Sequence, residues 1–264
     1  MQHDARPHDS RPGLNRPPQR QNAEEPRDGA APLQQWLINA VQETDTDDFR
    51  LKVAGEAHRL GAAGTTADLA RRLRDWKIDI KSGGRPVGLY IPRLVLERQL
   101  HAVAPDLVVH RDDQHPSGKA RFAEAGDRLH HEPSLSTEWL SLTAAFGKTF
   151  TNHIRASHGA TRIRLFRGIR TAAAPKVLGM TVRDRFLWAH RELAHGTVEN
   201  WTPAAGVAEG ALCDMPGVII GAEFDAGAVV CTHTIGAETN VTPWRVDGGR
   251  VLRTFRYTSI DARV

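Results

Sequence analysis

The chain carries an arginine on the apolar side of a predicted strand. Read with the two-residue period of a β-strand, the stretch RIRLFRGI (residues 162–169) puts Arg167 on the face of its aliphatic side chains. A buried guanidinium must find a carboxylate or an anion, because an unpaired charge in the interior costs several kcal/mol. Gly168 allows a ligand to approach the backbone closely. The alternative is an arginine at a strand end that reaches solvent or pairs with a core carboxylate.

Other patterns that carry chemistry fail on spacing. Zinc proteases place two histidines one helical turn apart, whereas His190 and His195 are five positions, or about 140° around a helix, apart. The adjacent His130 and His131 cannot both face one metal from a regular element. The sequence has no Gly-x-Ser-x-Gly nucleophile motif and no Gly-x-x-x-x-Gly-Lys-Ser/Thr phosphate loop. We therefore expect no metal site and no serine nucleophile.

A series of motifs in a fixed order remains. In chain order they are LFRG (165–168), ENWTPAAGVAE (199–209), GVIIGAEFDAGAVV (217–230) and GAETNV (236–241). This series resembles the Arg/Ser-Thr-Ser/Glu branch of the mono-ADP-ribosyltransferases, over residues of about 160–257. In that family an Arg-Gly closes the first strand, a Ser-aromatic-Ser/Thr motif leads into a short helix, and a Glu-x-Glu-Val precedes a late strand.

The resemblance implies a split β-sandwich of short strands that cleaves NAD, its substrate, without a metal. It implies Glu238 as the catalytic carboxylate and, around the NAD, Arg167, Gly168, Asn200, Trp201, Thr202 and Asn240. Side-chain chemistry agrees, because an arginine fork forms paired hydrogen bonds to a pyrophosphate and a carboxylate stabilises the cationic ribose left when nicotinamide departs. The implied acceptor of ADP-ribose is a protein or a nucleic acid, and the implied role is that of a toxin or effector.

The hydroxyl motif leaves two alternatives open. Trp201 can lie against a nucleotide ring or occupy the core. Thr202 can brace the site through its hydroxyl or simply favour a strand. Asn200 stands where the family has serine, and its amide can still donate and accept hydrogen bonds.

The late motif departs from the family at one position. Aligning Glu238-Thr239-Asn240-Val241 on Glu-x-Glu-Val puts Asn240 where the family has its catalytic glutamate. A neutral amide supplies no negative charge to a developing cation. Three interpretations follow: Glu238 acts after a local shift of its loop, the acid lies elsewhere, or the domain has lost activity and binds a partner or a nucleotide.

The composition is that of an ordinary water-soluble protein, with 40% hydrophobic and 25% charged residues among 264. No apolar run is long enough to span a bilayer, and the N-terminus lacks the apolar core of a secretory signal. We therefore expect a cytoplasmic protein, or one exported without a signal peptide, and no membrane partner. Cys213 and Cys231 are too few for a disulfide scaffold, and we expect both to be buried thiols.

Hydrophobic periodicity divides the chain into three parts and predicts an α+β fold. Residues 1–31, rich in proline and arginine, predict a disordered tail. Residues 32–133 predict a mostly helical region, with a helix capped by Thr66 that runs from Ala67 to Trp76, and with loops over residues 105–133. Residues 134–264 predict the ADP-ribosyltransferase-like domain, with two helical segments around the Arg167 strand and then short strands.

The net charge of +4 permits a nucleic-acid partner without requiring one. Arg71, Arg72 and Arg74 form a basic flank on a predicted helix, which suits either a helix-turn-helix or a solvated face. The sequence favours a mono-ADP-ribosyltransferase or NAD glycohydrolase. The alternatives are an inactive binding module of the same fold and a basic nucleic-acid-binding protein that acts through residues 33–103.

Overall fold

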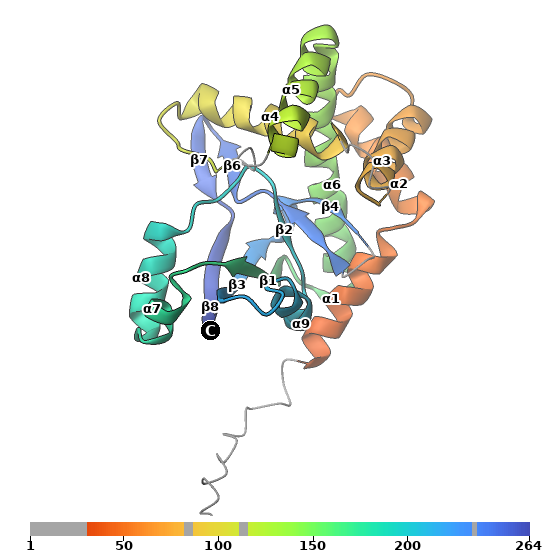
Figure 1. Ribbon diagram of the computed structural model, residues 1–264. Coiled ribbons are helices and arrows are strands. Elements are labelled where there is room, and N and C mark those ends of the chain that lie inside the picture. Colours follow the sequence, from red (N-terminus) through yellow and green to blue (C-terminus); the bar gives the residue numbers. More distant parts are fainter. Residues whose placement is uncertain (1–30, 82–86, 111–115, 234–236) are drawn as a thin grey trace, which may run out of the picture.

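The computed structural model describes residues 31–81, 87–110, 116–233 and 237–264. Helices form the first part of the described chain because apolar side chains recur there every three to four positions. In order they are α1 (Ala31–Glu43), α2 (Asp47–Arg59), α3 (Thr66–Lys81), α4 (Val87–Val103), α5 (Pro116–His131) and α6 (Ser134–His158). Figure 1 shows α2 to α5 gathered at one end and the long α6 running from them toward the strands. The predicted tail lies outside the described residues, except that its last residue, Ala31, begins α1.

The N-terminus of α3 differs from the prediction. Thr65, rather than Thr66, provides the cap, since its Oγ1 accepts the backbone N–H of Asp68 at 3.2 Å and its hydroxyl donates to the Asp68 carboxylate at 2.7 Å. This reciprocal pair is the usual device for satisfying the first free N–H groups of a helix. The helix also continues to Lys81, five residues beyond the predicted end at Trp76.

The prediction of loops over residues 105–133 is wrong for residues 116–131, which form α5. Ala125 and Leu129 are buried one turn apart and face the rest of the helical region. Most of the other α5 side chains are polar or charged, so its apolar stripe is too narrow to stand out in the sequence.

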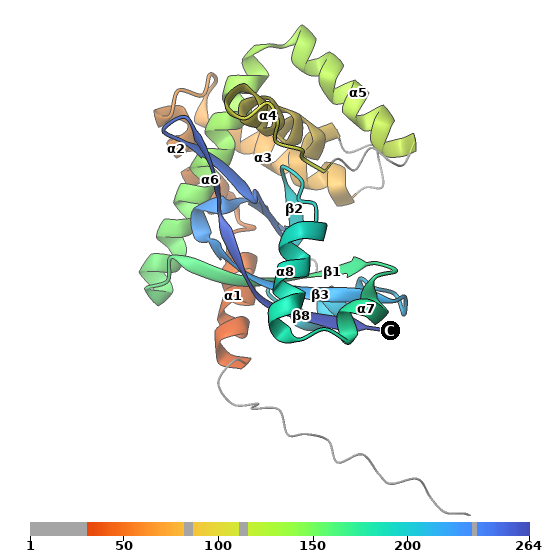
Figure 2. The same ribbon diagram turned by 90° about the vertical axis from the view of Figure 1, so that its left-hand side faces the viewer.

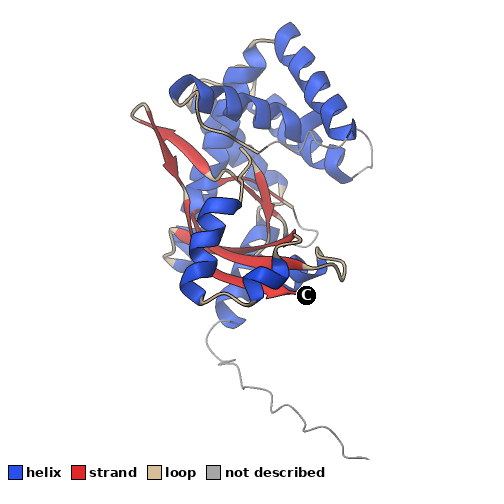
Figure 3. Cartoon of the chain, turned by 60° about the vertical axis from the view of Figure 1, so that its left-hand side comes forward, coloured by secondary structure: helices blue, strands red, loops and turns tan. Residues whose placement is uncertain are grey.

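The remaining elements are short. The helices are α7 (Ala174–Leu178), α8 (Val182–Glu192), α9 (Ala205–Gly210) and the 3₁₀ turn η1 (Ala226–Ala228). The strands are β1 (Arg162–Arg170), β2 (Glu199–Trp201), β3 (Gly217–Asp225), β4 (Val229–Thr232), β5 (Thr239–Val241), β6 (Trp244–Asp247), β7 (Arg250–Arg253) and β8 (Phe255–Arg263). They pair antiparallel in the orders β1-β3-β8, β2-β5-β4 and β6-β7. The predicted α+β class is thus confirmed (Figure 3).

Among the described residues, one backbone bridge, between Phe166 and Thr202, joins the two three-stranded sheets. Phe166 of β1 donates its N–H to the Thr202 carbonyl at 2.7 Å, and Thr202 donates to the Phe166 carbonyl at 2.9 Å. The bridge lies one residue before Arg167 and directly after β2. It therefore places the predicted arginine beside the predicted hydroxyl motif.

One apolar core serves both the helices and the strands. A single cluster of buried side chains runs from Leu37 of α1 to Ala262 of β8, and α6 contributes Phe150 and Ile154 to it. Figure 2 shows α6 running between the strands and the helical end of the molecule, and α2 and α4 are the helices that pack most closely against it. The division at residue 133 therefore separates elements by type and not by separate cores. None of the described helices is long and apolar enough to cross a membrane.

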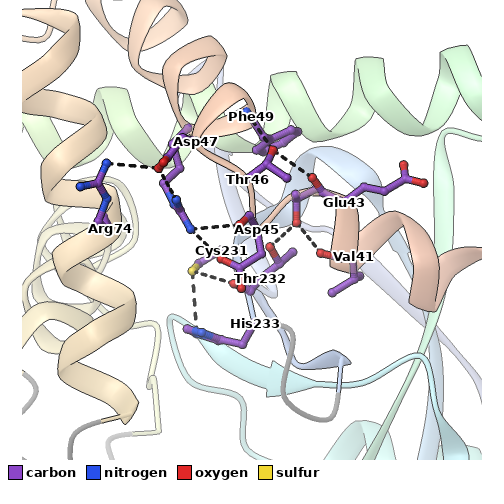
Figure 4. A network of polar contacts seen from close by, with 12 residues as sticks. Val41, Glu43, Asp45, Thr46, Asp47, Phe49, Arg74, Cys231, Thr232 and His233 are labelled. Carbon is purple, nitrogen blue, oxygen red and sulfur yellow. Dashed lines mark hydrogen bonds and ion pairs between the residues drawn. The ribbon is translucent and has the colours of Figure 1, made fainter.

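The junction between α1 and α2 is tied to β4 by polar contacts, part of which Figure 4 shows. The buried hydroxyls of Thr44 and Thr232 lie 2.5 Å apart, and Arg50 pairs with Asp45 at 2.7 Å and with Asp47 at 2.6 Å. Both threonines are buried, so their hydroxyls need a partner inside the protein. Each hydroxyl is the other's partner, and the hydrogen bond joins two chain segments that are distant in sequence.

Carboxylates partner every arginine of the predicted basic flank. Arg71 pairs with Asp68 at 2.8 Å, Arg72 with Glu138 at 2.7 Å and Arg74 with Asp47 at 3.1 Å. These pairs offset the positive charge that a phosphate backbone would need. The nucleic-acid hypothesis stays a prediction.

The contact of α6 with η1 requires a glycine. A Cβ added to Gly147 would collide with the backbone carbonyl of Gly227, which has no flexible end to move. We expect Gly147→Ala to lower the free energy of unfolding by about 1–3 kcal/mol, as overpacking does. The matched control is Gly126→Ala in α5, which meets nothing within 4 Å and should gain up to about 1 kcal/mol from helix propensity. Urea unfolding measures both, and equal stabilities of the two variants would contradict this packing.

Candidate functional site

A pocket of about 460 Å³ opens where β1, β2 and α9 meet. Six of the seven residues predicted from the motif series line it: Arg167, Gly168, Asn200, Trp201, Thr202 and Glu238. The other lining residues are apolar and come from β1 and from α9 and the residue after it: Phe166, Val207, Ala208 and Ala211. Volume and lining both suit a small-molecule site, which is typically apolar with a few placed polar groups. A larger cavity of about 590 Å³ lies elsewhere, beside α4, α6 and β6, and none of the predicted residues lines it.

Arg167 is partly exposed toward the pocket and partly paired with the protein. Its Nη1 lies 2.8 Å from Oε1 of Glu199, and the exposed fractions of the two side chains are 28% and 3%. Among the described residues, Glu199 is the ion-pair partner of Arg167. The planar guanidinium has five N–H donors, so the fork keeps donors for a ligand in the pocket. The structure thus combines the two alternatives, since the arginine pairs with a core carboxylate and also faces a cavity.

Glu199 has no role in the predicted site, although its carboxylate is the centre of the site's hydrogen bonds. Besides Arg167, it accepts from His195 Nδ1 at 3.0 and 3.1 Å, from the Gly196 N–H at 2.9 Å and from Trp201 Nε1 at 3.0 Å. Burial alone would raise the pKa of Glu199, but the charge of Arg167 and the bonds from His195 and Gly196 outweigh it and lower the pKa to about 2. The carboxylate is therefore ionised near neutral pH.

His195 links Glu199 to Tyr257 of β8. Since an ionised carboxylate only accepts hydrogen bonds, His195 must carry a proton on Nδ1. Its Nε2 lies 2.6 Å from the Tyr257 hydroxyl. Burial raises the pKa of Tyr257 well above its usual value, so the hydroxyl keeps its proton. The histidine thus serves a hydrogen-bond chain, and the described residues contain no group of metal ligands.

Of the two candidate residues in the late motif, Glu238 lines the pocket and Asn240 does not. Glu238 immediately precedes β5 and accepts a hydrogen bond from the Asn200 side chain. Burial raises the pKa of Glu238, while the Asn200 bond and the charge of Arg93 act in the opposite direction. Glu238 is therefore the carboxylate of the late motif that lines the pocket, and its role as the source of negative charge stays a prediction.

Asn240 lies in the middle of β5, opposite Asn200 of β2 and Cys231 of β4. It is 1% exposed, and within the described part of the chain neither atom of its amide has a hydrogen-bond partner. A buried amide without partners is costly, and such groups often mark a site for a water or a ligand group. It is the one predicted site residue that the pocket lining does not include.

Trp201 occupies the core. It is 2% exposed, and its ring centroid lies 4.9 Å from that of Phe224 in an edge contact. Its Nε1 donates to Glu199, so the indole supports that carboxylate. Trp201 is also part of the pocket lining. The Thr202 hydroxyl accepts the Ala204 N–H at 3.1 Å and so stabilises the turn into α9.

Gly168 is required by the protein itself. A Cβ at this position would collide with the backbone carbonyl of Ala208 in α9. The sequence predicts close approach by a ligand at Gly168, whereas the structure shows close approach by α9. The same contact lets α9 form one wall of the pocket.

The expectation of two buried thiols is wrong for Cys213. Cys231 is buried in β4, but Cys213 is exposed. Cys213 and Asp214 have φ angles of 48° and 58° in the turn between α9 and β3, and such a tight turn keeps its side chains at the surface.

Comparisons of the chain with protein-family models, with curated proteins and with solved structures found no match. The pocket and its side chains are therefore the basis for inferring a function.

The Glu199 network makes a pH-dependent contribution to stability. A carboxyl group whose pKa is lower in the folded protein than the usual 4.5 stabilises the fold above that value, and the contribution is lost as the pH falls toward about 2. We expect Glu199→Gln to cost about 3 kcal/mol at neutral pH, since it breaks a buried pair, and to flatten the acid part of the stability curve.

Urea unfolding between neutral pH and about pH 2 provides the measurement. Glu223→Gln is the matched control, because Glu223 pairs at the surface with Arg162 and Arg256 and should change stability by at most about 1 kcal/mol. Parallel curves for Glu199→Gln and the wild type would show that Glu199 is not held by this network.

Proposed function

We propose that the chain binds NAD in the 460 Å³ pocket and cleaves its nicotinamide–ribose bond, passing ADP-ribose to a protein or nucleic-acid acceptor or to water. The observation that carries the proposal is that an arginine fork and a carboxylate, Arg167 and Glu238, line the same pocket with Asn200 and Thr202. These residues belong to motifs far apart in the sequence. Their convergence supports the family resemblance, because the resemblance needs all of them in one cleft.

Arg167 is the group that binds the pyrophosphate. A guanidinium matches phosphate oxygens with paired, charge-assisted hydrogen bonds. Glu199 fixes one nitrogen of the fork, so less side-chain freedom is lost when the ligand arrives.

Glu238 is the group that stabilises the reacting ribose. When the C1′–N bond breaks, its electron pair leaves with the nicotinamide nitrogen and positive charge develops on the ribose. An ionised carboxylate in a partly buried pocket stabilises that charge more strongly than it would in water. The acceptor then forms the new bond to C1′ and releases a proton. The hydrogen bond from Asn200 holds the Glu238 carboxylate in place for this role.

The apolar wall has a function in the same scheme. Phe166, Val207, Ala208 and Ala211 line the same pocket as the polar groups. An apolar surface suits an uncharged leaving ring such as nicotinamide and limits the access of water to the reacting carbon.

A second candidate is a module that binds a nucleotide without cleaving it. Two observations favour it: Asn240 is buried as a neutral amide, and part of the Arg167 fork is already engaged by Glu199. In this case NAD binds with the same dependence on Arg167, but no nicotinamide is released.

Two conservative variants test the proposal. Glu238→Gln removes the charge without changing the size of the side chain, so nicotinamide release should fall about 10²–10³-fold, while the Kd for NAD changes little. Arg167→Lys keeps a cation beside Glu199 but loses the fork, and the Kd for NAD should rise about 10-fold or more.

Calorimetry with NAD and chromatographic detection of nicotinamide measure the two effects. Glu192→Gln, an exposed carboxylate on α8, is the control and should behave as the wild type does. Binding without release in the wild type would select the second candidate. A wild-type protein that neither binds NAD nor releases nicotinamide rules out both.

A further inference from the structure

The larger cavity, of about 590 Å³, is separate from the proposed NAD pocket. Its lining comes from α4, α6, η1, β4 and β6 and from the residues that follow α2 and β5. None of the residues that line the proposed NAD pocket lines it. Its volume is typical of a small-molecule site. The cavity therefore needs an explanation of its own.

Most of the cavity lining is apolar. The largest apolar contributions come from α4, α6 and β6: Leu96, Leu100, Leu140, Trp244 and Val246. Leu100 and Val230 are 3% and 2% exposed, whereas Leu60 is 45% exposed. The lining thus extends from buried side chains to the surface. An occupant gains most by bringing an apolar body, because its burial removes apolar surface from water.

The hydroxyl groups of the lining are already engaged within the protein. Ser141, Thr143 and Thr242 each donate to a backbone carbonyl, at 3.3, 3.0 and 2.7 Å respectively. Their protons are therefore not available to a ligand. A molecule with many hydroxyl groups, such as a sugar, would leave several of its own polar groups unpaired here.

Two cations line the cavity, Lys148 of α6 and Arg245 of β6, and no described aspartate or glutamate lines it. Lys148 pairs with Glu56 at 2.6 Å and Arg245 with Asp247 at 3.5 Å, and the two basic side chains are 59% and 55% exposed. An ammonium has three N–H donors and a guanidinium five, so both cations keep donors for a further anion. The charge of the lining complements a negatively charged group.

Helix α6 sets the distance between the apolar and the charged parts of the cavity. Leu140, Ala144 and Lys148 follow one another at intervals of four residues, so they lie on one face of this helix. At the rise of an α-helix, the eight residues from Leu140 to Lys148 cover about 12 Å. An extended alkyl chain of medium length matches this distance.

The indole of Trp244 adds a hydrogen-bond donor. Its Nε1–H is buried and has no hydrogen-bond partner among the described residues. The Arg253 guanidinium carbon lies 5.5 Å from the centre of the ring, a distance at which the cation is attracted to the ring face. A buried donor without a partner often marks a place for a water or a ligand atom. An occupant with an oxygen acceptor suits this donor.

We propose that this cavity binds a small amphiphilic anion of the fatty-acid class, with its alkyl chain against Leu100, Leu140 and Val230 and its carboxylate beside Lys148 and Arg245. The inference goes beyond the proposed function and does not rest on it. The ligand contacts the helical region and the strands together, because both line the cavity.

Calorimetry with decanoate, below its micelle concentration, tests the proposal, and decan-1-ol is the uncharged ligand of the same chain length. The wild type should bind one decanoate, and bind it about 10-fold or more tightly than decan-1-ol, since hydrogen bonds to charged groups are the stronger ones. Ala144→Phe fills the cavity and should abolish binding of both. Ala156→Phe, at another exposed position of α6, is the matched control and should bind as the wild type does.

A double variant tests the role of the charges. Lys148→Met together with Arg245→Met should remove the preference for decanoate over decan-1-ol and leave the affinity for decan-1-ol unchanged. Glu56 keeps Arg59 as an ion-pair partner in this variant, so its buried carboxylate is not left unpaired.

The inference is overturned if the wild type does not bind decanoate, if it binds decan-1-ol as tightly, or if Ala144→Phe binds decanoate as the wild type does. Val246→Phe narrows the cavity from β6 and takes the place of Ala144→Phe if that variant does not fold. Sedimentation provides one more outcome. A wild-type dimer that Ala144→Phe converts to a monomer would assign the cavity to a second copy of the chain and also overturn the inference.

Discussion

The buried carboxylate of Glu199 constrains the whole site. An ionised group that is 4% exposed must be surrounded by donors, and here they come from β1, from the segment before β2 and from β2 itself. Satisfying it fixes the position of Arg167, the proton of His195 and the plane of the Trp201 ring. The pocket is the space that remains in front of these groups, between them and α9. Its shape therefore follows from one electrostatic requirement as much as from hydrophobic packing.

The helices and strands also share one core, which supports the segment that carries Glu199. The loop that carries His195 and Glu199 is held by hydrogen bonds to the chain around α4, and α6 packs against both the helical bundle and the strands. If the helical region moved, the loop would move with it and Arg167 would lose its partner. A site that needs angstrom-scale placement of a fork and a carboxylate benefits from such a rigid support.

Strand alternation and the ordered motif series pointed to residues that line the pocket, but they did not point to the residues that support it. Period-two alternation placed Arg167 correctly, because the face of a residue in a strand depends on its neighbours alone. The same alternation was available for Glu199 and Trp201, but β2 is three residues long and too short to stand out. Arg93 meets Thr197 across 104 positions of sequence, a contact that no local pattern encodes. The sequence correctly indicates that Gly168 allows a close approach to the backbone. Only the fold shows that the approaching group is α9.

Amide shifts of ¹⁵N-labelled protein during a titration with NAD test most directly whether the pocket between β1, β2 and α9 binds NAD as proposed. The account predicts saturable shifts at Gly168, Asn200 and Ala208, which line that pocket. Absence of saturable shifts, or shifts confined to Leu100, Leu140 and Trp244 around the larger cavity, would contradict it.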